Sequence, residues 1–172
     1  MRYLVILLFL IFSCSGVTPT QPKNEEFNPY LERFIFEARI SKEEIDNKIH
    51  LEFHKYPDKS TVIGTCNLGV YKNVVWINID WWNRRDVSDY KREAMVFHEL
   101  GHCYLFRDHT FEIKNESSIS SWFNELLVEL GLKSDKKYLY DGCPISLMHP
   151  YVLSNRCYID HYDYYMKELF RR

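Results

Sequence analysis

The sequence lacks the hallmarks of several protein classes. It has no excess of positive charge, because 22 Lys and Arg face 24 Asp and Glu for a net charge of −2, and nucleic-acid binding would need a basic stripe. It has no internal repeat and no low-complexity block. No apolar run reaches the roughly 20 residues that a membrane-spanning helix needs. What remains is a globular composition, 46% hydrophobic and 27% charged over 172 residues, which is enough for one domain.

The N-terminus has the anatomy of an export signal. Arg2 is followed by an apolar run over residues 3–12 and then by the small residues around Cys14. This resembles a bacterial lipoprotein signal, which implies that Cys14 is lipidated and becomes the mature N-terminus. We therefore expect a signal peptide over 1–13, a tether over 14–27 and a folded domain over 28–172. The expected location is the cell envelope, held to a membrane by the lipid; plain secretion and an uncleaved anchor are the alternatives.

No CxxC pair occurs among the cysteines, which argues against a zinc site built from thiolates. In an oxidising compartment the four cysteines after the signal can form two disulfides, and three connectivities are possible. The sequence does not choose among them, and free buried cysteines are the alternative. The four are Cys66, Cys103, Cys143 and Cys157.

The hydrophobic periodicity predicts a single α+β domain. The Asn28-Pro29 pair is typical of a helix start, and Asp86 or Ser88 could cap the helix that carries the next motif. The expected helices cover 30–40, the stretch from 86 or 88 through 102, 120–130 and 158–170; the expected strands cover 49–54, 61–70 and 74–79. The backbone of residues 76–79 is our candidate for pairing with an extended substrate.

The chemistry is concentrated in His98-Glu99-Leu100-Gly101-His102. Two histidines four apart project from one face of a helix, close enough to bind one zinc ion. Glu99 would lie beside a zinc-bound water and act as the general base. Gly101 is costly inside a helix, by up to about 1 kcal/mol relative to Ala. Close packing beneath the metal is one reason to tolerate it.

This motif, followed by Asp108-His109 and later by Ser146-Leu147-Met148-His149-Pro150, resembles the metzincin clan of zinc metalloproteases. The resemblance implies a long zinc-binding helix, a third ligand beyond a tight turn, and Met148 in a methionine turn under the metal. It also implies a small metzincin-like α+β domain with a mixed β-sheet and a C-terminal helix. The expected activity is that of an endopeptidase acting on proteins or peptides.

The sequence departs from the clan at the turn, where position 105 is Leu instead of Gly. On a continued helix His109 would lie on the order of 10 Å beyond His102, too far for one ion. The chain must therefore turn near Phe106-Arg107, either through a left-handed residue costing about 1–2 kcal/mol or through a longer loop. We expect His109 as the third ligand, with Asp108 as the alternative.

A second arrangement stays open, because Asn124-Glu125 lies in an expected helix. In thermolysin-like zinc peptidases the third ligand is a Glu in such a context, although the Ser-Asp that follows it there is missing here. A charged, solvated helix face is the simpler interpretation of Glu125. Two further functional classes also remain: a zinc amide hydrolase acting on other substrates, and a non-catalytic zinc-binding envelope lipoprotein.

Overall fold

The computed structural model describes residues 25–110 and 138–171. They form an α+β domain, as the sequence predicts. The expected helix over 120–130, with Glu125, lies outside the described residues, and so do the signal and Cys14. The elements in chain order are η1 (Glu25–Phe27), α1 (Asn28–Ala38), α2 (Lys42–Lys48), β1 (Ile49–His54), β2 (Gly64–Asn67), β3 (Asn73–Asn78), α3 (Ile79–Trp82), α4 (Asp89–Cys103), α6 (Asn155–Asp160) and α7 (Tyr162–Leu169).

The sheet is mixed and has the strand order β1-β3-β2. β1 runs parallel to β3, and β2 runs antiparallel to it. Because β3 has a neighbour on both sides, the expectation that residues 76–79 pair with a substrate is wrong. An added strand could pair only with one of the two edge strands, β1 or β2. Of these, β2 is the one joined to helix α4 by a disulfide bond.

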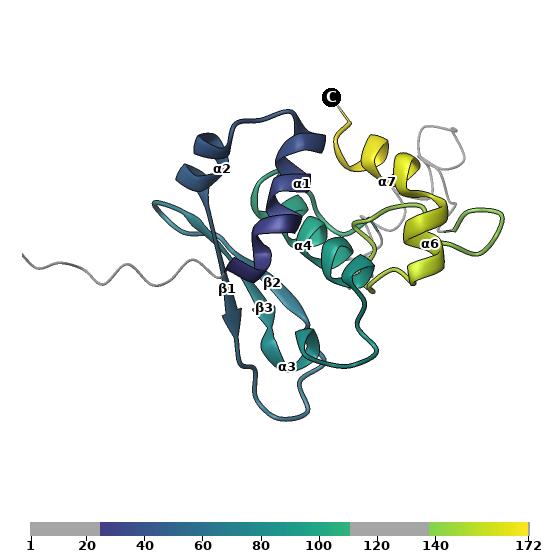
Figure 1. The fold of residues 1–172 in the computed structure, drawn as a ribbon, viewed down its shortest axis with the longest axis horizontal. Coiled ribbons are helices and arrows are strands. Elements are labelled where there is room, and N and C mark those ends of the chain that lie inside the picture. The colour runs from purple at the N-terminus through teal and green to yellow at the C-terminus, as the bar shows by residue number, and fades with distance from the viewer. Residues whose placement is uncertain (1–24, 111–137, 172) are drawn as a thin grey trace, which may run out of the picture.

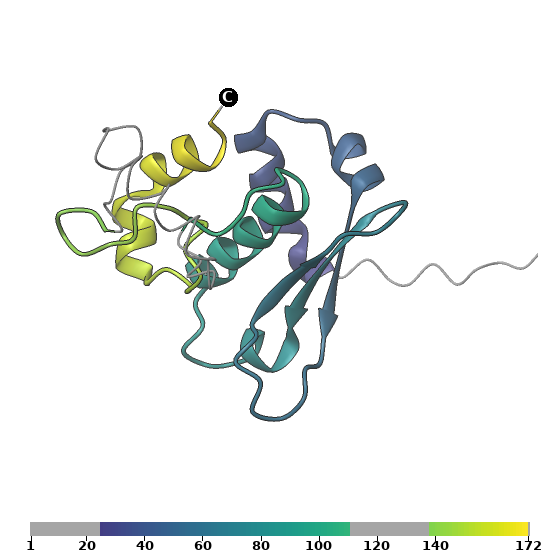
Figure 2. The same ribbon diagram turned by 180° about the vertical axis from the view of Figure 1, so that it is seen from behind.

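Helix α4 occupies the centre of the molecule, between the sheet and the pair α6 and α7 (Figure 1). α1 lies beside α4, and the view from behind shows the same order of layers (Figure 2). Phe34 of α1 and Phe97 of α4 meet edge to face at 5.2 Å and are fully buried. Burial of each such side chain stabilises the fold by about 1.5–3 kcal/mol. The core therefore fixes α4 from several sides.

The first turn of α4 shows why the helix begins where it does. The Ser88 side chain accepts a hydrogen bond from the Lys91 backbone N–H at 3.3 Å, which satisfies one of the donors that a helix start leaves open. Asp86, the other cap candidate, instead forms an ion pair with Arg84 at 2.6 Å. Ser88 is thus the cap.

The ends of the folded part differ from expectation. Phe27, which lies in the expected tether, is 2% exposed and packs on Phe53 and Trp82 at ring distances of 4.5 and 5.2 Å. The folded part therefore begins before residue 28. The expected closing helix is two helices, α6 and α7, separated at His161 by a non-helical φ of −118°. None of the helices in the two described ranges is long and apolar enough to cross a membrane.

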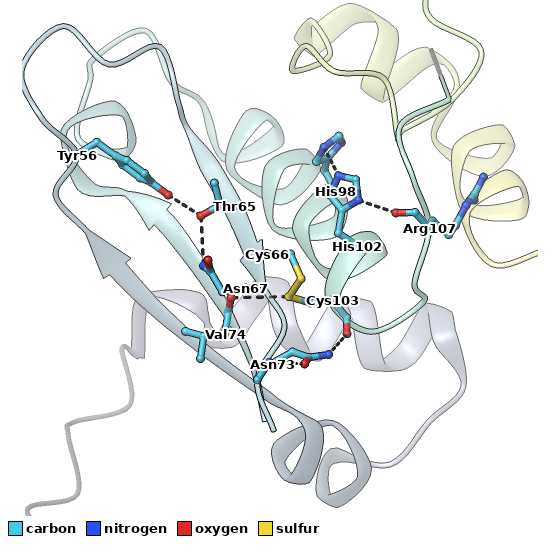
Figure 3. The surroundings of a disulfide bond; sticks show 11 residues. Tyr56, Thr65, Cys66, Asn67, Asn73, Val74, His98, His102, Cys103 and Arg107 are labelled. Atoms are coloured by element: carbon cyan, nitrogen blue, oxygen red, sulfur yellow. Dashed lines mark hydrogen bonds between the residues drawn. A yellow bond between two sulfur atoms is a disulfide. The ribbon is translucent and has the colours of Figure 1, made fainter. Parts of the chain in front are cut away.

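The four cysteines form two disulfides, as expected for an oxidising compartment. Cys66 is bonded to Cys103, and Cys143 to Cys157. The first bond joins the edge strand β2 to the end of α4, and Figure 3 shows it below His98 and His102.

Candidate metal site

Helix α4 brings His98 and His102 onto one face, one turn apart, as their spacing predicts. Their Nε2 atoms are 3.1 Å apart. His98 is 7% exposed. The pKa of its imidazole is lowered to about 3, mainly by burial and to a smaller extent by the neighbouring histidines, while a hydrogen bond to the Leu147 carbonyl acts in the opposite direction. His98 is therefore neutral near pH 7, the form in which an imidazole binds a metal ion.

The chain turns back directly after the helix and carries His109 to the same place. Phe106 takes the left-handed conformation at φ 55°, one of the two solutions expected in the absence of glycine. Its Cβ makes this conformation cost about 1–2 kcal/mol. The Arg107 N–H then donates to the Gly101 carbonyl at 3.0 Å and closes the turn. As a result, the Nε2 atoms of His109 and His98 are 3.0 Å apart.

The three histidines form a group that could hold a metal ion. One ring nitrogen from each of His98, His102 and His109 lies within 4.8 Å of the other two. Asp108, the alternative ligand in the turn, lines the same cleft but is not a member of this group. Glu125 lies outside the described residues.

Backbone carbonyls fix the orientation of two of the rings. Nδ1 of His98 is 2.8 Å from the Leu147 carbonyl, and Nδ1 of His102 is 2.6 Å from the Arg107 carbonyl. A carbonyl can only accept, so both Nδ1 atoms carry the proton. Both Nε2 atoms then carry lone pairs, and they point at each other across 3.1 Å. Facing lone pairs repel unless a cation lies between them, so the donor set suits a metal ion.

Met148 packs directly beneath the helix that carries the histidines. It is fully buried, and a Cβ added to Gly101 would collide with its sulfur atom. The close packing expected of Gly101 is thus present. The Met148 N–H donates to Ser146 Oγ at 3.0 Å, and its carbonyl accepts from the Thr110 N–H at 3.0 Å. These bonds tie the segment around Met148 to the turn that carries His109.

Glu99 lies next to the three histidines but is not a member of their group. It is 4% exposed, and burial raises the pKa of its carboxyl to about 8. The edge strand reaches this carboxyl: a Cβ on Gly64 would lie 2.6 Å from Glu99 Oε1 and 2.8 Å from Met95 Sδ. Glycine at position 64 therefore gives the strand backbone direct access to the carboxyl group.

A cleft of about 510 Å³ runs along these groups. One wall is the segment from Thr61 to Cys66 that leads into and includes most of β2; the opposite wall is His149, Pro150 and Tyr151, directly after Met148. The Tyr151 N–H donates to His149 Nδ1 at 3.3 Å. Because β2 is an edge strand of the sheet and forms part of this wall, an extended chain in the cleft could pair with it.

A second group of candidate ligands in the described residues does not form a metal site. Asp141, Cys143 and His161 lie within 4.8 Å of one another. Cys143 is bonded to Cys157 and has no thiolate to offer. His161 is instead held by Asp141, with 2.7 Å between Nε2 and the carboxylate oxygen.

Sequence reasoning missed three groups around the site. Gly64 belongs to no motif, and its role depends on close contact with the distant Glu99. Arg107 acts through its backbone carbonyl, which contacts His102 and which no sequence pattern marks. Glu168 is 7% exposed within the C-terminal helix α7. One signal was available for it, because Glu168 lies three residues after the buried Tyr165 and next to Leu169, on the apolar face of the helix.

Comparisons with known proteins add no assignment: no protein-family model, no curated protein and no solved structure matches the chain. The argument for function therefore depends on the residues of the cleft.

Proposed function

We propose that this chain is a zinc-dependent endopeptidase of the metzincin type, with His98, His102 and His109 as zinc ligands and Glu99 as general base. The observation that carries the proposal is the convergence of three imidazole nitrogens beside a buried carboxyl group in an open cleft. Met148, packed under Gly101, agrees with the methionine turn of that clan.

The donor set suits zinc. A tetrahedral ion with zinc–nitrogen bonds of roughly 2.0–2.1 Å needs nitrogen atoms about 3.3 Å apart. In the structure, Nε2 of His98 is 3.0 Å from Nε2 of His109 and 3.1 Å from Nε2 of His102. Three imidazole ligands leave one coordination position for water or substrate, which is typical of catalytic zinc. A bound zinc ion supplies Lewis-acid polarisation of the substrate carbonyl and lowers the pKa of water.

In this proposal Glu99 moves the proton. Its carboxyl borders the cleft and is not one of the clustered ligands, so it can accept a proton from the attacking water and return it to the leaving amine. Burial raises its pKa to about 8, which makes the carboxylate a stronger base than an exposed Glu. A cation held by the histidines favours the ionised form that this role needs.

The edge strand suits an extended peptide. The Asn78 N–H donates to the Ile63 carbonyl at 2.9 Å, and Thr65 faces Trp76 in the next hydrogen-bonding position. The N–H and C=O groups of Gly64 and Cys66 then point away from β3, toward the cleft. A peptide that adds to this edge places a scissile bond near Glu99 and forms main-chain hydrogen bonds independent of its sequence.

Export and anchoring belong to the same proposal. Two disulfides within the described residues agree with an oxidising compartment. We propose that lipidated Cys14 holds the protease to the outer side of a membrane, where it meets protein or peptide substrates.

The test is the substitution Glu99→Gln, assayed against casein and a peptide library with and without chelator. Because Glu99 is not a ligand in this proposal, the variant should keep one zinc per chain and lose turnover by at least 10²-fold. A variant that loses the metal, or that cleaves at the wild-type rate, would contradict the role of Glu99. Zinc without turnover in the wild type would favour a non-catalytic binding protein, and turnover of small amides alone would favour a zinc amide hydrolase.

A further inference from the structure

Glu168, on the C-terminal helix α7, is a buried carboxylate that the proposed reaction does not use. It is 7% exposed. One carboxylate oxygen accepts from Ser146 Oγ at 2.9 Å, and the other is paired with the Arg107 guanidinium. That guanidinium also donates to the carbonyls of Glu168 and Leu169 at 2.7 and 3.0 Å. A single carboxyl group thus connects two segments that are far apart in the sequence.

The first connection leads to His98. Ser146 donates its hydroxyl proton to Glu168, so the hydroxyl oxygen is turned to accept from the Met148 N–H at 3.0 Å. Leu147 lies between Ser146 and Met148 in the sequence, so this hydrogen bond holds the position of its carbonyl. This carbonyl accepts from Nδ1 of His98 at 2.8 Å.

The second connection leads to His102. The Arg107 side chain is held by Glu168, while the Arg107 carbonyl accepts from Nδ1 of His102 at 2.6 Å, a contact drawn in Figure 3. Arg107 directly follows the left-handed Phe106. The same residue therefore fixes the turn that leads to His109 and orients the ring of His102.

We propose that Glu168 is a positioning residue for the metal site: through Ser146 and Arg107 it fixes the two backbone carbonyls that orient His98 and His102. The inference rests on the proposed zinc site. Carbonyls that bind the far nitrogen of a ligand imidazole set its tautomer and its direction, and loss of such partners typically weakens metal binding 10–100-fold. A buried carboxylate stays with its partners because an unpaired charge in the interior is costly, so the position of both carbonyls is well defined.

The test uses Glu168→Gln, which keeps the shape and an acceptor oxygen but removes the charge that holds Arg107. Glu93→Gln is the matched control. Glu93 lies on α4 itself, the helix of the histidines, and accepts from the Tyr158 hydroxyl at 2.9 Å. Among the described residues, Glu93 has no hydrogen bond to the Leu147 or Arg107 segments whose carbonyls orient the histidines. Ser146→Ala tests the other arm separately and leaves the Arg107 ion pair in place.

Two measurements are made on each full-length variant. One is zinc affinity by competition with a chromophoric chelator at a fixed pH. The other is the pair of Nδ1–H proton resonances of His98 and His102 in the chelated protein. We expect Glu168→Gln to weaken zinc binding 10–100-fold and to speed exchange of both protons. Ser146→Ala should affect the His98 proton more than that of His102, and Glu93→Gln should change neither reading.

The outcomes separate the two proposals. If the wild type binds no zinc, the proposed function fails, and the proton resonances still decide the role of Glu168. If Glu168→Gln unfolds at a lower temperature but keeps wild-type zinc affinity and both protected protons, Glu168 has only a structural role and the inference is overturned. An additive effect of Glu168→Gln and Arg107→Gln in the double variant would also contradict it, because residues of one network are expected to be non-additive.

Discussion

At the scale of single residues, the pKa values of two neighbours on α4, His98 and Glu99, are shifted in opposite directions by the same cause. Burial disfavours the charged form of any group. It therefore lowers the pKa of the His98 imidazole to about 3 and raises that of the Glu99 carboxyl to about 8. Without a cation both side chains are neutral near pH 7. In the proposed zinc site, a bound cation would favour the ionised form of Glu99, so metal binding would be accompanied by loss of a proton.

This neutrality gives a pH prediction for the chelated protein. Glu99 has a folded pKa of about 8, above its ordinary value of 4.5, so the folded state holds its proton more tightly than the unfolded state. The associated stability is fully present below pH 4.5 and is lost as pH rises toward 8. Relative to Glu99→Gln, the wild type should lose up to about 1.4 kcal/mol of unfolding free energy per pH unit in this window.

The measurement is urea unfolding of both chelated proteins between pH 5 and 8.5. His98 contributes the opposite trend, since its lowered folded pKa gives stability above pH 6.5 that is lost as the pH falls. Both proteins carry His98, so its effect cancels in the difference. Parallel stability curves for the two proteins would show that the Glu99 carboxyl is not buried in the chelated state.

Sequence reasoning works at this scale where the chemistry is local. The spacing of His98 and His102 is fixed by the helix period. The need for a turn before His109 follows from the length of a continued helix, and Phe106 supplies it. Glu168 was missed because its partners, Ser146 and Arg107, are brought to it only by the fold.

At the scale of elements, the disulfide Cys66–Cys103 joins the edge strand β2 to the helix α4 (Figure 3). Cys103 follows His102 directly, and Cys66 lines the cleft. The neighbouring bond from Asn73 Nδ2 to the Cys103 carbonyl, 2.7 Å long, adds a second link between sheet and helix. The wall of the cleft that would bind a peptide is therefore fixed to the helix that carries the histidines.

Replacing Cys66 and Cys103 by Ser should have two effects. The unfolding free energy should fall by about 4 kcal/mol, because the bond closes a long loop. The KM for an extended peptide should rise several-fold, because β2 is no longer fixed against α4, while zinc content stays at one per chain.

The matched control is the replacement of Cys143 and Cys157, which form the other disulfide and do not line the cleft. This variant should also lose stability, by about 3 kcal/mol for its shorter loop, but its KM should stay near the wild-type value. Equal KM values for both disulfide variants would remove the support for peptide binding along β2.

Elements with strong periodicity were predictable, and short elements were not. Strand β1 covers Ile49–His54, the range expected from the sequence, and α1 begins at the expected Asn28-Pro29 pair. The single turn of α3 and the short α2 were missed because each depends on a side-chain cap, from Asn78 and Ser41 respectively. Strand order was also not predictable, since it depends on pairing between distant segments.

At the scale of the whole molecule, the candidate site forms where two halves of the chain meet. α4 contributes the histidines and Glu99 from one side, and the segment after residue 145 contributes Met148 and the Leu147 carbonyl from the other. Glu168 of α7 contacts both parts, because it is bound by Arg107, which follows α4, and by Ser146, which precedes Met148. The sequence predicts the parts of the site, whereas the disulfide pairing and the network beneath the histidines are consequences of the packed fold.

The most direct test of the account is a zinc competition titration of three variants, His109→Ala, Asp108→Asn and Glu125→Gln, at one pH. The pH is held because protons compete with the metal for its ligands. The account predicts that His109→Ala lowers zinc affinity by orders of magnitude, since two imidazoles remain. Asp108→Asn should cost at most the 10–100-fold typical of a residue that touches a ligand without binding the ion, and Glu125→Gln should keep wild-type affinity. Loss of zinc in Glu125→Gln with retention in His109→Ala would contradict the three-histidine site and favour a thermolysin-like arrangement.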